Sequence, residues 1–234
     1  NKTAASCYNR TVLKTFLALK ELIYPTTCAG CNLIGIQICN TCGENWQAAP
    51  KLNFVGKQKL YFVAKYNPQS ARIILSAKEN TNKFCINLLA ECIARSITFA
   101  LPVSIWAQQI TITTIPSSPA AIRRRGRDHI SELAKQVVKL LATENISATY
   151  IPILYLAKNI KDQSGLNSSQ RAQNLSGAFS IKNCEIPKGD LFLIDDLVTT
   201  GASIQEGVRA LANAKISITA VITACAVGRN SLIR

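Results

Sequence analysis

The chain has 234 residues, of which 48% are hydrophobic, so it can bury a full core and is expected to form one main domain with an appendage. Its 27 Lys and Arg residues against 13 Asp and Glu residues give a net charge of +14, which favours polyanionic partners such as nucleic acid or phosphorylated ligands. No apolar stretch reaches the roughly 20 residues that a bilayer span requires, so the sequence argues against a membrane protein. Most of the nine cysteines stand singly, which favours reduced thiols and predicts a cytoplasmic location.

The predicted elements begin with an amphipathic helix over residues 11–24, which we prefer to a signal peptide because charged residues interrupt its apolar face. A turn-rich unit with four cysteines follows, and together they form a predicted N-terminal part over residues 1–50. The rest of the chain, residues 51–234, is predicted to form the main domain. Within it, we expect a basic connector and a helix over 51–108 and an α/β core over 109–234.

Four cysteines in the N-terminal part form two C-x-x-C pairs separated by seven residues: Cys28, Cys31, Cys39 and Cys42. Two short loops with this spacing can present four thiolates to one tetrahedral zinc ion. Because cysteine would occupy every ligand position, the spacing predicts a structural zinc site rather than a catalytic one. The alternative is a redox function, which needs one such pair at the head of a helix in a thioredoxin-like unit.

After a buried helix, short apolar runs alternate with helical patterns from residue 109 onward, which is typical of an α/β domain with a mostly parallel sheet flanked by helices. The expected order is a buried helix over 84–100, a strand over 110–115, a helix over 129–142, strands over 150–156, 179–181 and 191–194, a helix over 203–214 and a strand over 216–224.

Two adjacent carboxylates, Asp195 and Asp196, follow the apolar strand 191–194, and a helix begins a few residues later. The intervening loop offers backbone N–H groups, hydroxyls and a glycine at a helix start, where the helix dipole favours a dianionic phosphate. The alternative is a helix N-terminus with acidic residues in its first turn. A Walker phosphate loop is excluded, because no Gly-Lys-Ser/Thr follows. The loop residues are Thr199, Thr200, Gly201, Ala202 and Ser203.

The string D-D-L-V-T-T-G-A-S resembles the 5-phosphoribosyl-1-pyrophosphate loop of type I phosphoribosyltransferases. This resemblance implies their α/β fold, with Asp195 and Asp196 meeting the ribose hydroxyls and the magnesium-bound ligand. It also implies that the loop 199–203 wraps the 5-phosphate. Ser117 and Ser118 follow the strand 110–115, where such enzymes place a pyrophosphate-binding loop.

The order of motifs from about Phe16 to the C-terminus resembles the ComF family of competence-associated, amidophosphoribosyltransferase-like proteins. The motifs are the four-cysteine unit, a basic connector with Lys78, an Arg-Gly segment, Q-x-x-L-x-x-x-x-R-x-x-N-x-x-G-A-F over 163–179, and D-D-x-V-T-T-G. Two strings depart from the family pattern. The Arg-Gly segment continues as 127–129 Arg-Asp-His instead of Phe-Asn-Gln, and 78–81 is Lys-Glu-Asn-Thr instead of Lys-Tyr-Arg-Gly.

The long connection between the strands 150–156 and 179–181 carries three cations that could close over a pyrophosphate: Lys158, Lys161 and Arg171. His129, the one histidine, is interpreted as a surface or capping residue rather than an acid or base. The leading hypothesis is phosphoribosyl transfer from the pyrophosphate donor with magnesium to an unidentified acceptor.

The alternative function is a factor that handles single-stranded DNA in DNA uptake, with the donor site retained for a ligand or for regulation. The basic segments 51–83 and 123–127 are where a phosphate backbone could dock, although a solvated basic face explains such charge runs equally well.

Overall fold

The structure is a computed structural model that describes residue 22 and residues 25–101, 109–158, 175–185 and 189–228. Its elements in chain order are α2 (Asn40–Gln47), β1 (Lys51–Val55), β2 (Gln58–Lys65), α3 (Pro68–Glu79), α4 (Lys83–Ala100), β3 (Ile110–Thr114), α5 (Pro119–Arg125), α6 (His129–Thr143), β4 (Ala148–Tyr150), β5 (Leu154–Leu156), β6 (Phe179–Ile181), β7 (Leu191–Val198), α8 (Ala202–Asn213) and β8 (Ala220–Ala226). None of the helices within these ranges is long and apolar enough to cross a membrane.

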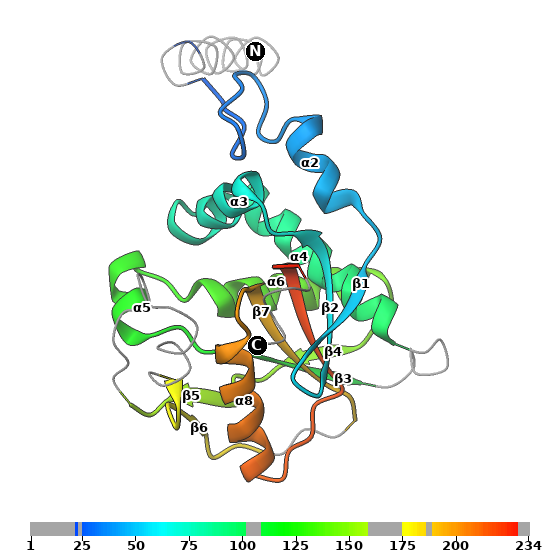
Figure 1. Cartoon of the computed structure of the whole chain (residues 1–234), viewed down its shortest axis with the longest axis vertical. Coiled ribbons are helices and arrows are strands. Elements are labelled where there is room, and N and C mark those ends of the chain that lie inside the picture. The colour runs from blue at the N-terminus through cyan, green and yellow to red at the C-terminus, as the bar shows by residue number, and fades with distance from the viewer. Residues whose placement is uncertain (1–21, 23–24, 102–108, 159–174, 186–188, 229–234) are drawn as a thin grey trace, which may run out of the picture.

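A six-stranded sheet in the order β1-β2-β8-β7-β3-β4 forms the centre of the molecule (Figure 1). All neighbouring strands from β2 to β4 are parallel, and β1 joins the edge as the antiparallel partner of β2. A tight turn at Gly56, whose φ is 59°, connects these two strands. β5 and β6 form a separate antiparallel pair. The predicted α/β fold with a mostly parallel sheet is confirmed.

Helices cover both faces of the sheet (Figure 1). α3, α4 and α6 pack on one face, and their core includes Leu133 of α6 and Phe192 and Ile194 of β7. α8 and the β5–β6 pair cover the other face, where Leu193 of β7 meets Ile204 of α8. β7 therefore contributes alternate side chains to two cores, as a central strand buried on both faces must.

β3 and β7 are parallel neighbours with Thr114 opposite Ile194, and the chain leaves them toward opposite edges of the sheet. From β3 the chain continues through α5 and α6 to β4 at the sheet edge, whereas from β7 it continues through α8 to β8 on the opposite side. In open α/β sheets, a crevice forms at such a point, outside the carboxyl ends of the strands. The loops after β3 and β7 are therefore expected to enclose a ligand site.

The prediction of one strand over 150–156 is wrong. β4 ends at Tyr150 in the main sheet, and β5 begins at Leu154 in the small sheet. Pro152 lies between them and has no backbone N–H to donate to a ladder. The predicted strand 179–181 is present as β6, but it pairs with β5 instead of joining the main sheet.

The expectation of a basic connector before the helix 84–100 is also wrong. Residues 51–65 form the β1–β2 hairpin, which extends the main sheet, and residues 68–79 form α3. The lysines of this segment obscured alternating and helical apolar positions such as Leu60, Phe62, Ile73 and Ile74, all of which are buried. The predicted helix after the connector is confirmed as α4, and its Cys85 and Cys92 are fully buried in the core.

Candidate ligand cleft and four-cysteine site

A cleft of about 440 Å³ opens at the carboxyl ends of β3 and β7. Six of the predicted site residues line it, and they belong to the segments that follow β3 or end β7 and begin α8: Ser117, Ser118, Asp195, Asp196, Thr199 and Ser203. Thr200, Gly201 and Ala202 complete the loop after β7 without lining the cleft themselves. The structure thus brings together residues that are about 80 positions apart in sequence.

The two aspartates lie within β7, which continues to Val198 instead of ending before them. Asp196 is only 4% exposed. Its Oδ2 lies 3.0 Å from Nζ of Lys78, at the end of α3, and 3.3 Å from Nε2 of His129. Asp195 is less buried, and its Oδ1 accepts a hydrogen bond from the backbone N–H of Asp196 (2.9 Å). Among the described residues, Asp196 therefore has a salt bridge to a cation and Asp195 has none.

The pKa values of the two carboxyl groups are driven apart. Burial and the neighbouring charge of Asp196 raise the pKa of Asp195 to about 8. Burial also disfavours the charge on Asp196, but Lys78 and the contact with His129 outweigh it and hold the pKa of Asp196 well below its usual range. The site therefore keeps one permanent carboxylate. The charged form of the second carboxyl group, that of Asp195, would be stabilised by a cation or by hydroxyl groups of a ligand.

His129 is not the surface or capping residue that the sequence suggested. It is 1% exposed, and neither ring nitrogen has a hydrogen bond of acceptable geometry, although Nε2 lies 3.3 Å from Asp196. α6 begins at His129 directly beside the carboxyl end of β7, which places this side chain under the acidic loop. A tertiary contact between segments 67 positions apart leaves no trace in the local sequence pattern.

The loop after β7 leads into α8 through Gly201, whose φ of 77° lies in the left-handed region. A Cβ atom at this position would lie 2.6 Å from Cγ1 of Val55, so both backbone conformation and space require glycine. The N-cap residue Gly201 has no side chain to cap α8, and the Ala202 N–H donates a long hydrogen bond to Thr200 Oγ1 (3.4 Å). The next N–H groups of the first turn, those of Ser203 and Ile204, have no side-chain cap among the described residues and can donate to an anion.

The remaining predicted residues have different positions. Ser118 caps α5 by accepting a hydrogen bond from Ala121 N–H (3.2 Å), in addition to lining the cleft. Lys158 is exposed, does not line the cleft, and places its Nζ 3.0 Å from the position that a Cβ of Gly177 would occupy. Lys161 and Arg171 lie outside the described residues.

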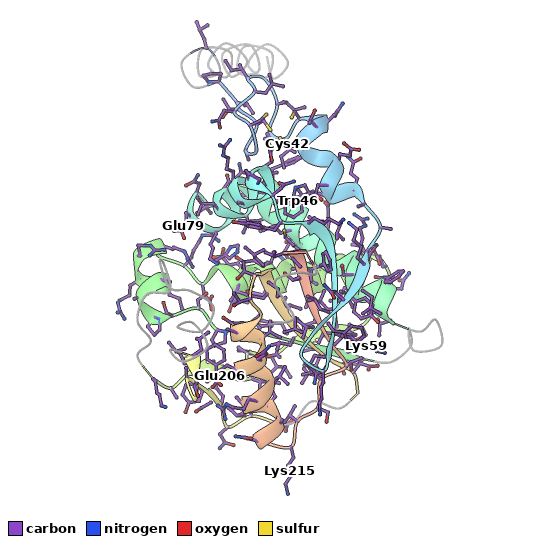
Figure 2. All side chains as sticks on the ribbon, viewed as in Figure 1. Cys42, Trp46, Lys59, Glu79, Glu206 and Lys215 are labelled. Atoms are coloured by element: carbon purple, nitrogen blue, oxygen red, sulfur yellow. The ribbon has the colours of Figure 1, made fainter. Side chains whose placement is uncertain are left out.

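Sequence reasoning missed the opposite wall of the cleft, which is formed by α3 and α5. Lys78 and Glu79 end α3, and Arg124 and Arg125 end α5. Glu79 Oε1 accepts hydrogen bonds from Arg124 (3.2 Å) and from Nε of Arg125 (2.9 Å). Figure 2 labels Glu79 at this junction. These residues belonged to segments interpreted as basic runs, and their pairing depends on the fold.

The apolar part of the cleft includes Phe179, the first residue of β6, which is held from α8. Glu206 is 6% exposed and accepts hydrogen bonds from the backbone N–H of Phe179 (3.1 Å) and from Nε and Nη2 of Arg209 (2.7 Å each). Burial opposes the charge on Glu206, but the hydrogen bonds from Arg209 lower its pKa overall. Figure 2 shows Glu206 on the inner side of α8, beside β6.

The four cysteines gather at one point of the N-terminal unit, with their sulfur atoms within 4.8 Å of one another. Sγ atoms of Cys31 and Cys39 are 3.6 Å apart, close to the roughly 3.8 Å separation that four Zn–S bonds of about 2.3 Å impose. The backbone N–H of Cys39 donates a hydrogen bond to Cys28 Sγ (3.3 Å). Burial raises the pKa of the Cys28 thiol, but this and neighbouring N–H groups outweigh burial and lower that pKa to about 6. The cluster could hold a zinc ion.

The four-cysteine unit is packed onto the main core. Cys28 and Cys42 are buried in the same hydrophobic cluster as α3 and α4, together with Trp46, which is 1% exposed. Cys42 and Trp46 are one turn apart on α2, as Figure 2 shows. Arg95 of α4 donates a hydrogen bond to the backbone carbonyl of Trp46 (3.0 Å) at the end of α2. Residues 1–50 remain a predicted domain, but part of their core is shared.

No family model matches the chain. A stretch of 86 residues, 36% of the chain, is 35% identical to competence protein F of Haemophilus influenzae. This stretch spans 35% of the length of that protein, about a third. The match agrees with the ComF resemblance seen in the sequence.

Two solved structures are similar in fold. Orotate phosphoribosyltransferase from Aeropyrum pernix gives a TM-score of 0.31 at 11% identity, covering 79% of this chain and 77% of that one. Adenine phosphoribosyl transferase from Trypanosoma brucei, solved with AMP, pyrophosphate and ribose-5-phosphate, gives 0.37 at 8% identity, covering 77% and 90%. Likenesses at this level carry no argument about substrate or activity.

Proposed function

We propose that this chain is a ComF-like phosphoribosyltransferase-domain protein that binds 5-phosphoribosyl-1-pyrophosphate with magnesium and transfers its phosphoribosyl group to an acceptor. The observation that carries the proposal is the position of Asp195: a carboxyl group with no salt bridge to any described residue shares one cleft with Thr199, Ser203 and the start of α8. The resemblance of the loop 195–203 to the phosphoribosyl-pyrophosphate loop supplies the identity of the ligand.

The 5-phosphate is assigned to the loop after β7. Backbone N–H groups at the start of α8 and the hydroxyls of Thr199 and Ser203 can donate hydrogen bonds to phosphate oxygens. Gly201 lies against the side chain of Val55 with no room for a Cβ, so this loop is packed against β1 in the ligand-free protein. A preformed loop of this kind orients the ribose without paying an ordering cost on binding.

Asp195 is assigned to the ribose hydroxyls and to magnesium. Magnesium prefers oxygen ligands and is usually held by one or two carboxylates together with the phosphates of the ligand. Asp195 fits this preference because burial and the charge of Asp196 raise its pKa, so a bound cation would stabilise its charged form. Magnesium would neutralise the charge of the departing pyrophosphate. Asp196 remains paired with Lys78 and acts by positioning Asp195.

In the proposed reaction, the bond between C1 and the pyrophosphate oxygen breaks with its electron pair staying on pyrophosphate. A nucleophile of the acceptor forms the new bond to C1 and releases its proton. The residues of this chain contribute by fixing the phosphate and the ribose and by stabilising charge, since none of the cleft-lining residues is an activated nucleophile.

The test is calorimetric titration of the donor with magnesium into the wild type and Asp195→Asn. Wild type should bind, and Asp195→Asn should bind at least about ten-fold more weakly, because charged hydrogen bonds contribute about 1.5–3 kcal/mol each. Asp190→Asn is the matched control, since Asp190 immediately precedes the opposite end of β7, and within the described part of the chain its side chain accepts a hydrogen bond from Thr219 Oγ1 (2.6 Å). A wild type that does not bind the donor, or an Asp195→Asn variant that binds equally well, contradicts the proposal.

We also propose that the four cysteines hold a structural zinc ion. The sulfur atoms are gathered within bonding range of one point, and no position is left for water or substrate. Metal analysis of freshly purified, reduced protein should find one zinc per chain. Its absence would leave the redox alternative, in which the same thiols form disulfides.

The second candidate function, handling of single-stranded DNA, is favoured by the net charge of +14 and by the similarity to a competence protein. Lys57 and Lys59 of the hairpin and Arg123 and Arg124 of α5 are exposed. Binding to single-stranded DNA should weaken steeply with salt, because each phosphate contact releases counterions. An affinity that does not change between low and physiological salt, or no binding at either, rules this function out.

A further inference from the structure

The wall of the cleft formed by the ends of α3 and α5 carries arginines that the assignments of the 5-phosphate, the ribose and magnesium do not involve. α5 carries two pairs at i,i+4 spacing, Ala120 with Arg124 and Ala121 with Arg125, and all four residues line the cleft. The small alanines leave room in front of the helix, and the arginines border that space. Gly126, with a φ of 69°, ends the helix directly after them.

Arg125 is held in place but not saturated. Its side chain is 7% exposed, and its Nε donates a hydrogen bond to Glu79 (2.9 Å). Its two Nη nitrogens make no hydrogen bond with any described residue, and neither is among the fully buried atoms without a partner. Because Arg125 lines the cleft, its two Nη nitrogens can donate to a ligand there, and their spacing matches two oxygens of a carboxylate or phosphate.

The charge of this wall is positive. Burial opposes ionisation of Glu79, but its hydrogen bonds with Arg125 and Arg124 lower its pKa overall, so it carries one negative charge against two guanidinium groups. Lys78 is already matched by Asp196. One positive charge remains without a partner among the described residues, at the point where Arg125 has spare donors.

We propose that Arg125, positioned by Glu79 and assisted by Arg124, forms a second anion-binding subsite in the cleft, which takes the phosphate or carboxylate of a ligand group that the loop 199–203 does not hold. The anion could come from the pyrophosphate end of the donor or from an acceptor that carries a carboxylate. Both sources rest on the proposed function. Leu175 and Phe179 line the same cleft and would pack against an aromatic acceptor acid.

The experiment measures binding by calorimetry with three probes: inorganic pyrophosphate with magnesium, ribose 5-phosphate, and benzoate added to protein saturated with pyrophosphate and ribose 5-phosphate. Arg125→Gln should weaken pyrophosphate or benzoate by about ten-fold or more and leave ribose 5-phosphate unchanged. If Arg125→Gln weakens the binding of pyrophosphate, the subsite belongs to the donor. If it weakens the binding of benzoate alone, the subsite belongs to the acceptor. Arg125→Lys keeps the charge without the fork and should lose an intermediate amount.

Arg123→Gln is the matched control, because Arg123 carries the same charge on the same helix but is exposed and does not line the cleft. If Arg123→Gln has the same effect as Arg125→Gln, or if no probe depends on Arg125, the subsite does not exist. Arg124→Gln provides a second variant that cannot unfold the core, since this side chain is 62% exposed, and it should lose about two- to three-fold. Failure of ribose 5-phosphate and donor to bind the wild type contradicts the proposed function instead.

Discussion

The two walls of the cleft are built in different ways. One is a continuous segment, from Asp195 to Ser203, delivered by a single buried strand. The other is assembled from the ends of α3 and α5, where Glu79 meets arginines 45 and 46 positions further along the chain. A continuous segment keeps its chemistry in its local sequence, whereas an assembled wall exists only once two helices are docked. The first wall should therefore tolerate changes elsewhere in the fold, and the second should not.

The assembled wall depends on the four-cysteine unit through α3. Arg72 of α3 donates a hydrogen bond to the backbone carbonyl of Gly30 (3.2 Å), between the first two cysteines. A Cβ at Gly30 would lie 2.8 Å from Cys42 Sγ and 3.4 Å from Ile73, so the turn, the cysteine cluster and α3 are in close contact. Glu79 lies less than two turns further along the same helix.

The largest effect is expected from removing the proposed zinc ion. Chelation of this ion, or Cys39→Ser, should unfold the unit around the cysteines at a cost of several kcal/mol and loosen α3, because a structural zinc ion supplies much of the folding free energy of such units. Binding of pyrophosphate should weaken, while binding of ribose 5-phosphate should change little. Trp46 fluorescence reports the unfolding, since this side chain is buried one turn from Cys42. Cys184→Ser, at an exposed cysteine outside the cluster, is the control. Equal weakening of both ligands would show that the walls are not independent.

The sequence predicted the continuous wall and the elements that deliver it. β3, β7 and α8 have clear apolar patterns, and their loops carry distinctive residues such as Asp195 and Gly201. It did not predict the assembled wall, because Lys78 and Arg125 lie in basic segments where a solvated surface is the ordinary interpretation. His129 was misjudged because its burial depends on the position of α6 against β7 and not on its neighbours in the sequence.

The next effect separates the two adjacent aspartates, which a sequence motif treats as equivalent. Asp196→Asn should destabilise the protein by about 1–3 kcal/mol, because it leaves the partly buried Lys78 and the buried His129 without their carboxylate. Asp195→Asn should not destabilise it at pH 7. Chemical denaturation of both variants provides the comparison.

A double-mutant cycle with Lys78→Gln tests the reason for that difference. If the loss in Asp196→Asn comes from the unpaired lysine, the double variant should be more stable than the sum of the two single changes implies. Strict additivity would mean that Asp196 stabilises the fold by some other contact.

The smallest effect is a pH dependence confined to Asp195. Burial and the charge of Asp196 raise its pKa to about 8 in the folded protein, above the value of about 4 in an unfolded chain. Because the folded state binds this proton more tightly, the stability linked to it is present at low pH and is lost as pH rises through the folded pKa. Asparagine at this position cannot ionise, so Asp195→Asn should become progressively more stable than the wild type between pH 5 and pH 9, by on the order of 1 kcal/mol because Asp195 is partly exposed. Thermal melting of the ligand-free proteins across this range measures the difference, with Asp190→Asn melted in parallel as the matched variant. A constant difference between wild type and Asp195→Asn would mean that the carboxylate is already compensated in the free protein, which removes the reason for it to attract magnesium.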